Sequence, residues 1–108
     1  MPKLHRIFEM PGLPPRELSP NYRLDRHVVA TAKAQARSDM VAMVREQGWF
    51  GPGVLYATLT ITFIATDRRR RDYDNLLAAC KSWIDGLVQS DVLQFDDTAH
   101  LQINLMYQ

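Results

Sequence analysis

Two aspartates spaced two positions apart, Asp72 and Asp74, lie between a run of four arginines and the amide Asn75. Arginine forks bind phosphate oxygens, and clustered carboxylates bind a hard divalent cation such as Mg²⁺. A cation of this kind activates water for attack on a phosphodiester. The segment therefore indicates phosphate chemistry. The four arginines are Arg68, Arg69, Arg70 and Arg71.

A third acid would complete a metal site. In an extended segment, side chains at i and i+2 project to the same side, so Asp72 and Asp74 are expected to converge. Asp96 and Asp97 form the only adjacent acidic pair in the rest of the chain. Three carboxylates around Mg²⁺ leave coordination positions for water and a phosphate oxygen. Lys81, two helical turns after Asp74, is placed to neutralise charge that develops on the phosphate.

The same acids also have ordinary structural roles. Asp74 suits an N-cap, Asp72 can pair with the arginines, and Asp96 and Asp97 can form a turn. His100 lies close enough to Asp97 in the sequence to contact it. The residues alone leave these alternatives open beside the metal site.

Length and composition predict one domain over residues 1–108, because 46 % hydrophobic content is enough for a single core. The 13 basic and 12 acidic residues leave a formal charge of +1, which excludes a polybasic coat protein. The charge is patterned instead. Asp67–Arg71 carries +3 (four Arg less one Asp), whereas Asp91–Asp97 carries three Asp and no base.

Cys80 is the single cysteine, which excludes an intramolecular disulfide and disfavours a cysteine-based zinc site. Its position on an apolar stripe predicts a small core residue. No apolar run approaches the roughly 18 residues of a membrane span, and the first six residues contain no apolar signal region. We expect a soluble cytoplasmic protein with no membrane partner.

The elements that must position these residues follow from the spacing of apolar side chains. A short strand is expected over Leu4–Met10, followed by a proline-rich loop. Helical periodicity predicts an amphipathic helix over Asp25–Gln47, which Gly48 ends. Strict alternation predicts a strand over Val54–Ala65, with Leu55 and every second residue after it on one apolar face.

Helical spacing returns over Asn75–Ser90, and alternation returns over Leu101–Tyr107. The predicted order is β-α-β-α-β, an α/β (α+β-like) fold in which helices pack on one mixed three-stranded sheet. Its exposed strand edges predict a homodimer. If the last strand lies beside Val54–Ala65, the two acidic clusters are expected to meet at one rim of the sheet.

Several of these motifs resemble the RusA family of Holliday junction resolvases, small endodeoxyribonucleases common in phages and prophages. Asp67–Leu76 is similar to the family signature, and Asp85–Val88 and Val92–Leu93 follow it before Asp96-Asp97. Leu18–Arg23 resembles the loop before the first helix in phage-type members. Together these segments cover most of the chain in the family's order.

The resemblance implies a homodimer that binds four-way DNA junctions and cuts two strands of like polarity, in DNA recombination and repair, in a bacterial or phage-infected cell. It implies Mg²⁺, with Mn²⁺ as an alternative, held by Asp72, Asp74 and either Asp96 or Asp97, of which we slightly favour Asp97. The residues implied to contact DNA are Arg68, Arg69, Arg70, Arg71 and Arg23. Asn75 is implied to support the site from the start of the helix.

Two departures from the family pattern define an alternative. Some members place a catalytic lysine one turn after the second Asp, where this chain has Ala78, and Lys81 is the expected substitute. The family usually continues into a further strand, which is expected to be missing here because the chain stops at Gln108. The alternatives are a catalytically inactive RusA-like module that binds DNA junctions, and a protein-interaction domain whose arginines pair with its own acids.

Overall fold

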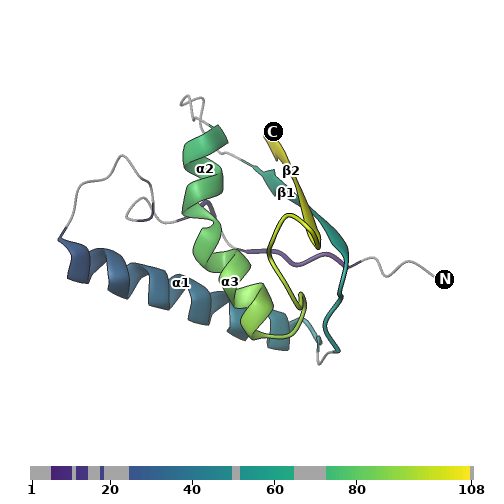
Figure 1. Ribbon diagram of the computed structural model, residues 1–108. Helices are drawn as coiled ribbons and strands as arrows, with labels where there is room; N and C mark the ends of the chain where they lie inside the picture. The colour runs from purple at the N-terminus through teal and green to yellow at the C-terminus, as the bar shows by residue number, and fades with distance from the viewer. Residues whose placement is uncertain are drawn as a thin grey trace.

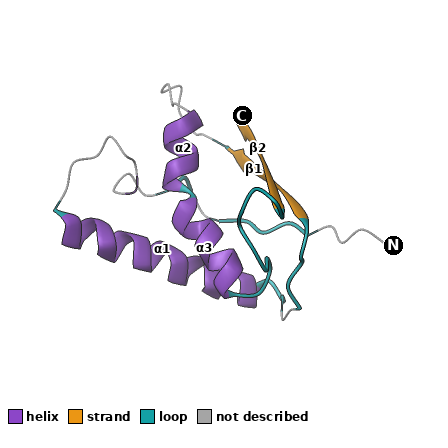
Figure 2. Ribbon diagram, in the orientation of Figure 1, coloured by secondary structure: helices purple, strands orange, loops and turns teal. Residues whose placement is uncertain are grey.

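A computed structural model of the chain describes residues 6–10, 12–14, 18, 25–49, 52–64 and 73–107. Helices α2 and α3 follow one another along one side of a pair of strands, and α1 crosses α3 on the side away from the strands (Figures 1 and 2). The described part is thus a small mixed α/β domain. In chain order its elements are α1 (Arg26–Glu46), β1 (Ala57–Phe63), α2 (Tyr73–Ala79), α3 (Lys81–Gln89) and β2 (Leu101–Tyr107).

The two strands are neighbours and run parallel, in register from Ala57 beside Leu101 to Phe63 beside Tyr107. The last strand therefore lies beside the strand after α1, which was the condition set for a meeting of the two acidic clusters. Their direction has a consequence for the acidic clusters, because the connection that follows β1 and the connection that precedes β2 leave opposite ends of a parallel pair. A meeting of the two clusters therefore depends on the path of the loop between α3 and β2.

The expected two-sided character of β1 is confirmed. Alternate residues from Ala57 to Phe63 turn toward the core, and the threonines between them are exposed. Leu55 was wrongly assigned to the apolar face, because the regular strand begins only at Ala57 and the Leu55 side chain is 42 % exposed.

The expected N-terminal strand is wrong for its described residues, Arg6–Met10, which have no strand partner. At Glu9, the backbone hydrogen bonds that a neighbouring strand would make are made by the Gln47 side-chain amide. It accepts a hydrogen bond from the Glu9 N–H (3.2 Å) and donates one to the Glu9 carbonyl (3.1 Å). Only Phe8 and Met10 pack on the core, so the apolar alternation is too short to hold a third strand in the sheet. The predicted β-α-β-α-β order and mixed sheet therefore reduce to two parallel strands in the described residues.

Helix α1 confirms the predicted amphipathic helix almost to the residue. Asp25 caps its first turn, because the carboxylate accepts a hydrogen bond from the His27 N–H at 2.7 Å. Its buried side consists of Ala36, Met40, Val41 and Val44. Among the described helices none is both long and apolar enough to cross a membrane.

The single helix expected over Asn75–Ser90 is two helices that meet at Cys80. The Cys80 N–H is shared between the carbonyls of Leu76 (3.1 Å) and Leu77 (3.0 Å), so the backbone tightens at this point. The Cys80 carbonyl still accepts from the Ile84 N–H at 3.0 Å, so α3 continues directly from α2. Periodicity did not reveal the break because the apolar stripe runs through it.

Three groups of buried side chains form the core. Trp83 of α3 is only partly buried, yet it packs against all three groups and joins them. Helices α1 and α3 are in close contact at Gly86, where an added Cβ would lie 2.7 Å from Met40 Cβ and 2.8 Å from the Arg37 carbonyl oxygen. A glycine is therefore required by packing rather than by backbone conformation. The largest group is Met40, Val44, Ile84, Leu87, Val92, Leu93 and Leu101.

Helix α1 ends in a Schellman motif, in which a left-handed residue lets two N–H groups return to the last turn. Gly48 (φ 89°) is the left-handed residue and donates to the Arg45 carbonyl at 3.1 Å. The Trp49 N–H donates to the Val44 carbonyl, also at 3.1 Å. The predicted stop at Gly48 is confirmed.

Helix α3 ends in the same way, but its left-handed residue is Asp91 (φ 61°). The Asp91 N–H donates to Val88 (3.1 Å) and the Val92 N–H to Leu87 (3.0 Å). The Trp49 indole N–H donates to the Asp91 carbonyl at 3.0 Å. The ends of α1 and α3 are therefore tied together.

An Asp91→Gly variant is expected to be more stable by about 0.5–1 kcal/mol. A left-handed conformation costs a residue with a Cβ about 1–2 kcal/mol, and glycine removes this cost. The free energy gained exceeds the conformational entropy that glycine adds to the unfolded chain. Thermal or urea unfolding measures the difference. The bond from Trp49 uses the Asp91 backbone and survives the change. Asp91→Ala is the control and should destabilise, and a loss of stability in Asp91→Gly would contradict the assignment.

Candidate functional site

The basic and acidic segment before α2 is described only in part. Arg68, Arg69, Arg70, Arg71, Asp72 and Arg23 lie outside the described residues, so their predicted roles stay predictions. Asp74 is the second residue of α2, and its backbone alone is described. Asp74 therefore lies inside the first turn of α2 rather than before it. A carboxylate in the first turn remains favourable, because helix N-termini carry partial positive charge. Asn75 follows in the same turn and is half-buried.

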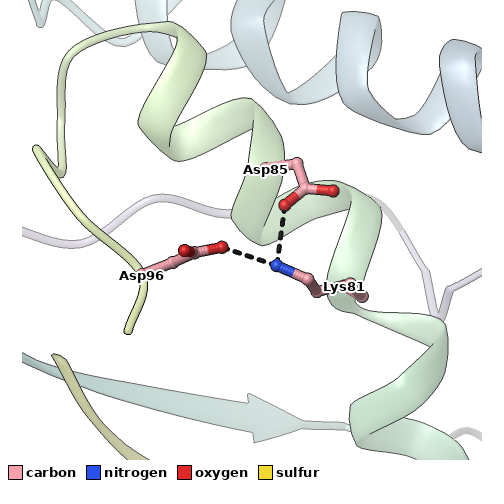
Figure 3. A network of polar contacts seen from close by, with 3 residues as sticks. All are labelled: Lys81, Asp85 and Asp96. Carbon is pink, nitrogen blue, oxygen red and sulfur yellow. Dashed lines mark hydrogen bonds and ion pairs between the residues drawn. The ribbon is translucent and has the colours of Figure 1, made fainter. Parts of the chain in front are cut away.

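Lys81 lies between two carboxylates, as Figure 3 shows. Its Nζ is 2.8 Å from Asp85 Oδ1, one turn further along α3, and 2.5 Å from Asp96 Oδ2, in the loop before β2. Lys81 and Asp85 thus lie on one side of α3, as their spacing of four residues requires. The contact with Asp96 was not predicted, and it brings the later acidic pair to the helix.

These three side chains face solvent to different degrees. Lys81 is 59 % exposed, Asp85 40 % and Asp96 35 %. The hydrogen bonds to Asp85 and then to Asp96 raise the pKa of Lys81, which keeps its ammonium charged. Ion pairs this exposed contribute only about 0–1 kcal/mol to stability. The cluster therefore places charge at an accessible surface more than it holds the fold together.

The Asp97 carboxylate stabilises the turn in which it lies. Its Oδ1 accepts hydrogen bonds from the backbone N–H groups of Ala99 (3.0 Å) and His100 (3.1 Å), and lies 2.7 Å from His100 Nδ1. These contacts, with the His100 side chain first, lower the pKa of the Asp97 carboxyl. Asp97 thus forms the turn that the sequence left open as an alternative to a metal site, and its nearness to His100 in the sequence corresponds to a direct contact.

The His100 ring is held from outside the turn by two exposed aromatic side chains. It stacks on Tyr56, just before β1, with ring centroids 5.2 Å apart, and lies 4.6 Å from the Phe95 ring. Phe95 directly precedes the acidic pair in the chain. The ring cluster therefore fixes the loop that presents Asp96 to Lys81. Sequence spacing gave no sign of it, since Tyr56 and His100 are distant in the chain.

Cys80 takes no part in this surface. Its side chain is 1 % exposed and packs with Phe63 and Leu76. Burial raises the pKa of the thiol to about 12, so it stays protonated and unreactive at neutral pH. The predicted core role is confirmed.

The donor chemistry at Asp96 suits a hard cation, although the described residues bring no three potential ligands together. Asp96 offers one carboxylate at an accessible position. Asp74 precedes Lys81 by seven positions in the chain, and the junction of α2 and α3 at Cys80 lies between them. The remaining donors of the predicted site, Asp72 and the Asp74 carboxylate, lie beyond the described atoms.

The chain is similar to an uncharacterized protein of Xylella fastidiosa (strain Temecula1), with 37 % identity over 87 residues. The similarity covers 78 % of this chain but 56 % of the relative, so the chain spans about half the relative's length. No protein-family model and no solved structure matches the chain.

Proposed function

We propose that this chain is a Mg²⁺-dependent, structure-selective endodeoxyribonuclease of the RusA type, which resolves Holliday junctions by paired phosphodiester hydrolysis. It would act as a cytoplasmic homodimer in DNA recombination and repair. The proposal rests on the resemblance of Asp67–Leu76 to the family signature and on one observation of the structure. The loop before β2 presents Asp96 to Lys81, the first residue of α3, seven positions after Asp74 in the chain.

Asp96 is the better candidate for the third metal ligand, although the sequence slightly favoured Asp97. Oδ1 of Asp97 already accepts three hydrogen bonds within its own turn. Among the described residues, only the Lys81 ammonium forms a hydrogen bond with Asp96, which reaches toward α3 (Figure 3). We therefore assign the metal to Asp72, Asp74 and Asp96, and give Asp97 the task of shaping the turn.

The proposed site divides the work among charged groups. The bound cation supplies Lewis acidity and an activated water. Lys81 neutralises negative charge that develops on the phosphate, for which its ammonium has a third N–H not used by the two aspartates. The arginines Arg68, Arg69, Arg70 and Arg71 bind phosphates of the junction, with Arg23 beside them. Asn75 supports the acidic segment from the first turn of α2.

Cleavage of a labelled mobile four-way junction, with and without Mg²⁺, tests the proposal. We expect symmetric, metal-dependent cuts in the junction and none in a linear duplex of the same sequence. Asp74→Asn should abolish the cuts while junction binding persists. Binding without cuts in the unaltered chain would favour the inactive junction-binding module. No binding at moderate salt would exclude both DNA-directed functions.

A further inference from the structure

The two carboxylates that contact Lys81 differ in how they are held. Asp85 lies one turn after Lys81 on the same helix, so this pair persists wherever the loop moves. Asp96 comes from the loop, and its Oδ2 meets the ammonium only while the loop is folded against α3. The Lys81 ammonium thus pairs both with Asp85, which is fixed on the same helix, and with Asp96, which belongs to the proposed metal site.

The pairing of Lys81 with Asp96 affects cation binding. A divalent cation at Asp96 must compete with the Lys81 ammonium for the same carboxylate, since both are positive and both need its oxygens. Asp85 gives the ammonium a second carboxylate at 2.8 Å that the cation does not need. When Asp96 turns to a metal, Lys81 can stay on Asp85.

We propose that Asp85 is a positioning residue, which draws the Lys81 ammonium away from Asp96 and so frees that carboxylate for a divalent cation. The inference rests on the proposed function, because it takes Asp96 as a metal ligand. The three side chains are 35–59 % exposed, so solvent limits the effect to about two- to fivefold in cation affinity.

Binding of Mn²⁺ to the whole chain without DNA, followed by electron paramagnetic resonance, measures the effect. We expect Asp85→Asn to weaken the binding about two- to fivefold, and Lys81→Gln to strengthen it. The Lys81→Gln/Asp85→Asn double variant should bind like Lys81→Gln alone, because Asp85 then has no ammonium to hold. Asp85→Glu, which keeps the carboxylate, should bind like the unaltered chain.

Simple long-range attraction gives the same signs for the single variants, so the double variant is decisive. If Asp85 acts only through its charge, the two effects add, and additivity overturns the proposal. Matched charge changes on α1, Asp39→Asn and Lys33→Gln, should change the affinity less than twofold. Asp39 is a fair match because it accepts an exposed hydrogen bond from Gln35, four residues earlier, at 2.7 Å.

The outcomes separate this inference from the proposed function. Coupled variants in a chain that never cuts a junction would support the inference and reject the nuclease. Additive variants in a chain that does cut would reject only the inference. If the unaltered chain binds no Mn²⁺, or if Asp96→Asn leaves the Mn²⁺ binding unchanged, both the inference and the proposed function are overturned.

Discussion

An Asp96→Asn variant is expected to lose metal-dependent junction cleavage by at least about 100-fold while remaining folded. The amide cannot supply the negative charge that a hard divalent cation needs, and loss of a group at the metal costs at least as much as loss of its hydrogen-bonded support. Junction binding should persist or strengthen, because one fewer carboxylate opposes the phosphates. Gel-shift and cleavage assays on the same junction measure the two effects separately.

Asp97→Asn is the matched comparison, with the same chemical change one residue away. We expect a less stable protein whose folded fraction still cuts. The Asp97 pKa is lowered in the fold, so its stabilisation is present above the ordinary range of carboxyl titration and is lost as the pH falls through the folded pKa. The variant should therefore be less stable at neutral pH and approach the unaltered chain in strong acid. Loss of cleavage in Asp97→Asn, with cleavage kept in Asp96→Asn, would reverse the ligand assignment.

A Gly86→Ala variant is expected to be destabilised by about 1–3 kcal/mol, which lowers Tm by roughly 4–8 °C for each kcal/mol in a domain of this size. The added methyl would lie within 3 Å of Met40 Cβ and of the Arg37 carbonyl oxygen. Neither atom is the far end of a flexible side chain, so α1 and α3 must move apart. Thermal and urea unfolding followed by circular dichroism measure the loss.

Helix propensity alone gives the opposite sign for this change, because alanine favours a helix over glycine by about 1 kcal/mol. Ala78→Gly, at an exposed position of α2, measures that preference without a contact and should destabilise by about that amount. A Gly86→Ala protein that is more stable than the unaltered chain would show that the helices do not approach here as described.

Much of the fold was predictable where a pattern is long and is decided locally. Helix α1 has 21 residues, a capping aspartate and a left-handed glycine just past its end, so the local signals agree. The prediction of an N-terminal strand failed because its alternating apolar residues are few. Two long-range hydrogen bonds join the Glu9 backbone to the Gln47 side chain instead of to a strand. The break at Cys80 failed for another reason, since a shared backbone hydrogen bond leaves no trace in side-chain spacing.

The candidate site shows the same division. Lys81 and Asp85 share a side because they lie four residues apart on one helix, which spacing in the sequence fixes once the helix is known. The contact of Lys81 with Asp96 depends on the loop between α3 and β2. The left-handed Asp91 starts this loop locally, and two features that join distant parts of the chain direct it further: the backbone bridge between Val54 and Leu93, and the rings around His100. The bridge and the stacking of Tyr56 on His100 require the tertiary fold, so sequence spacing did not reveal that Asp96 reaches the helix.

The position of Trp83 determines how this small domain comes apart. Its side chain packs against all three groups of buried side chains, two of which contain residues of α1 and two of which contain residues of α2. Loss of any one group exposes part of the same side chain and weakens the other two. The domain is therefore built to unfold cooperatively, with no stable state in which only the helices or only the strands have separated.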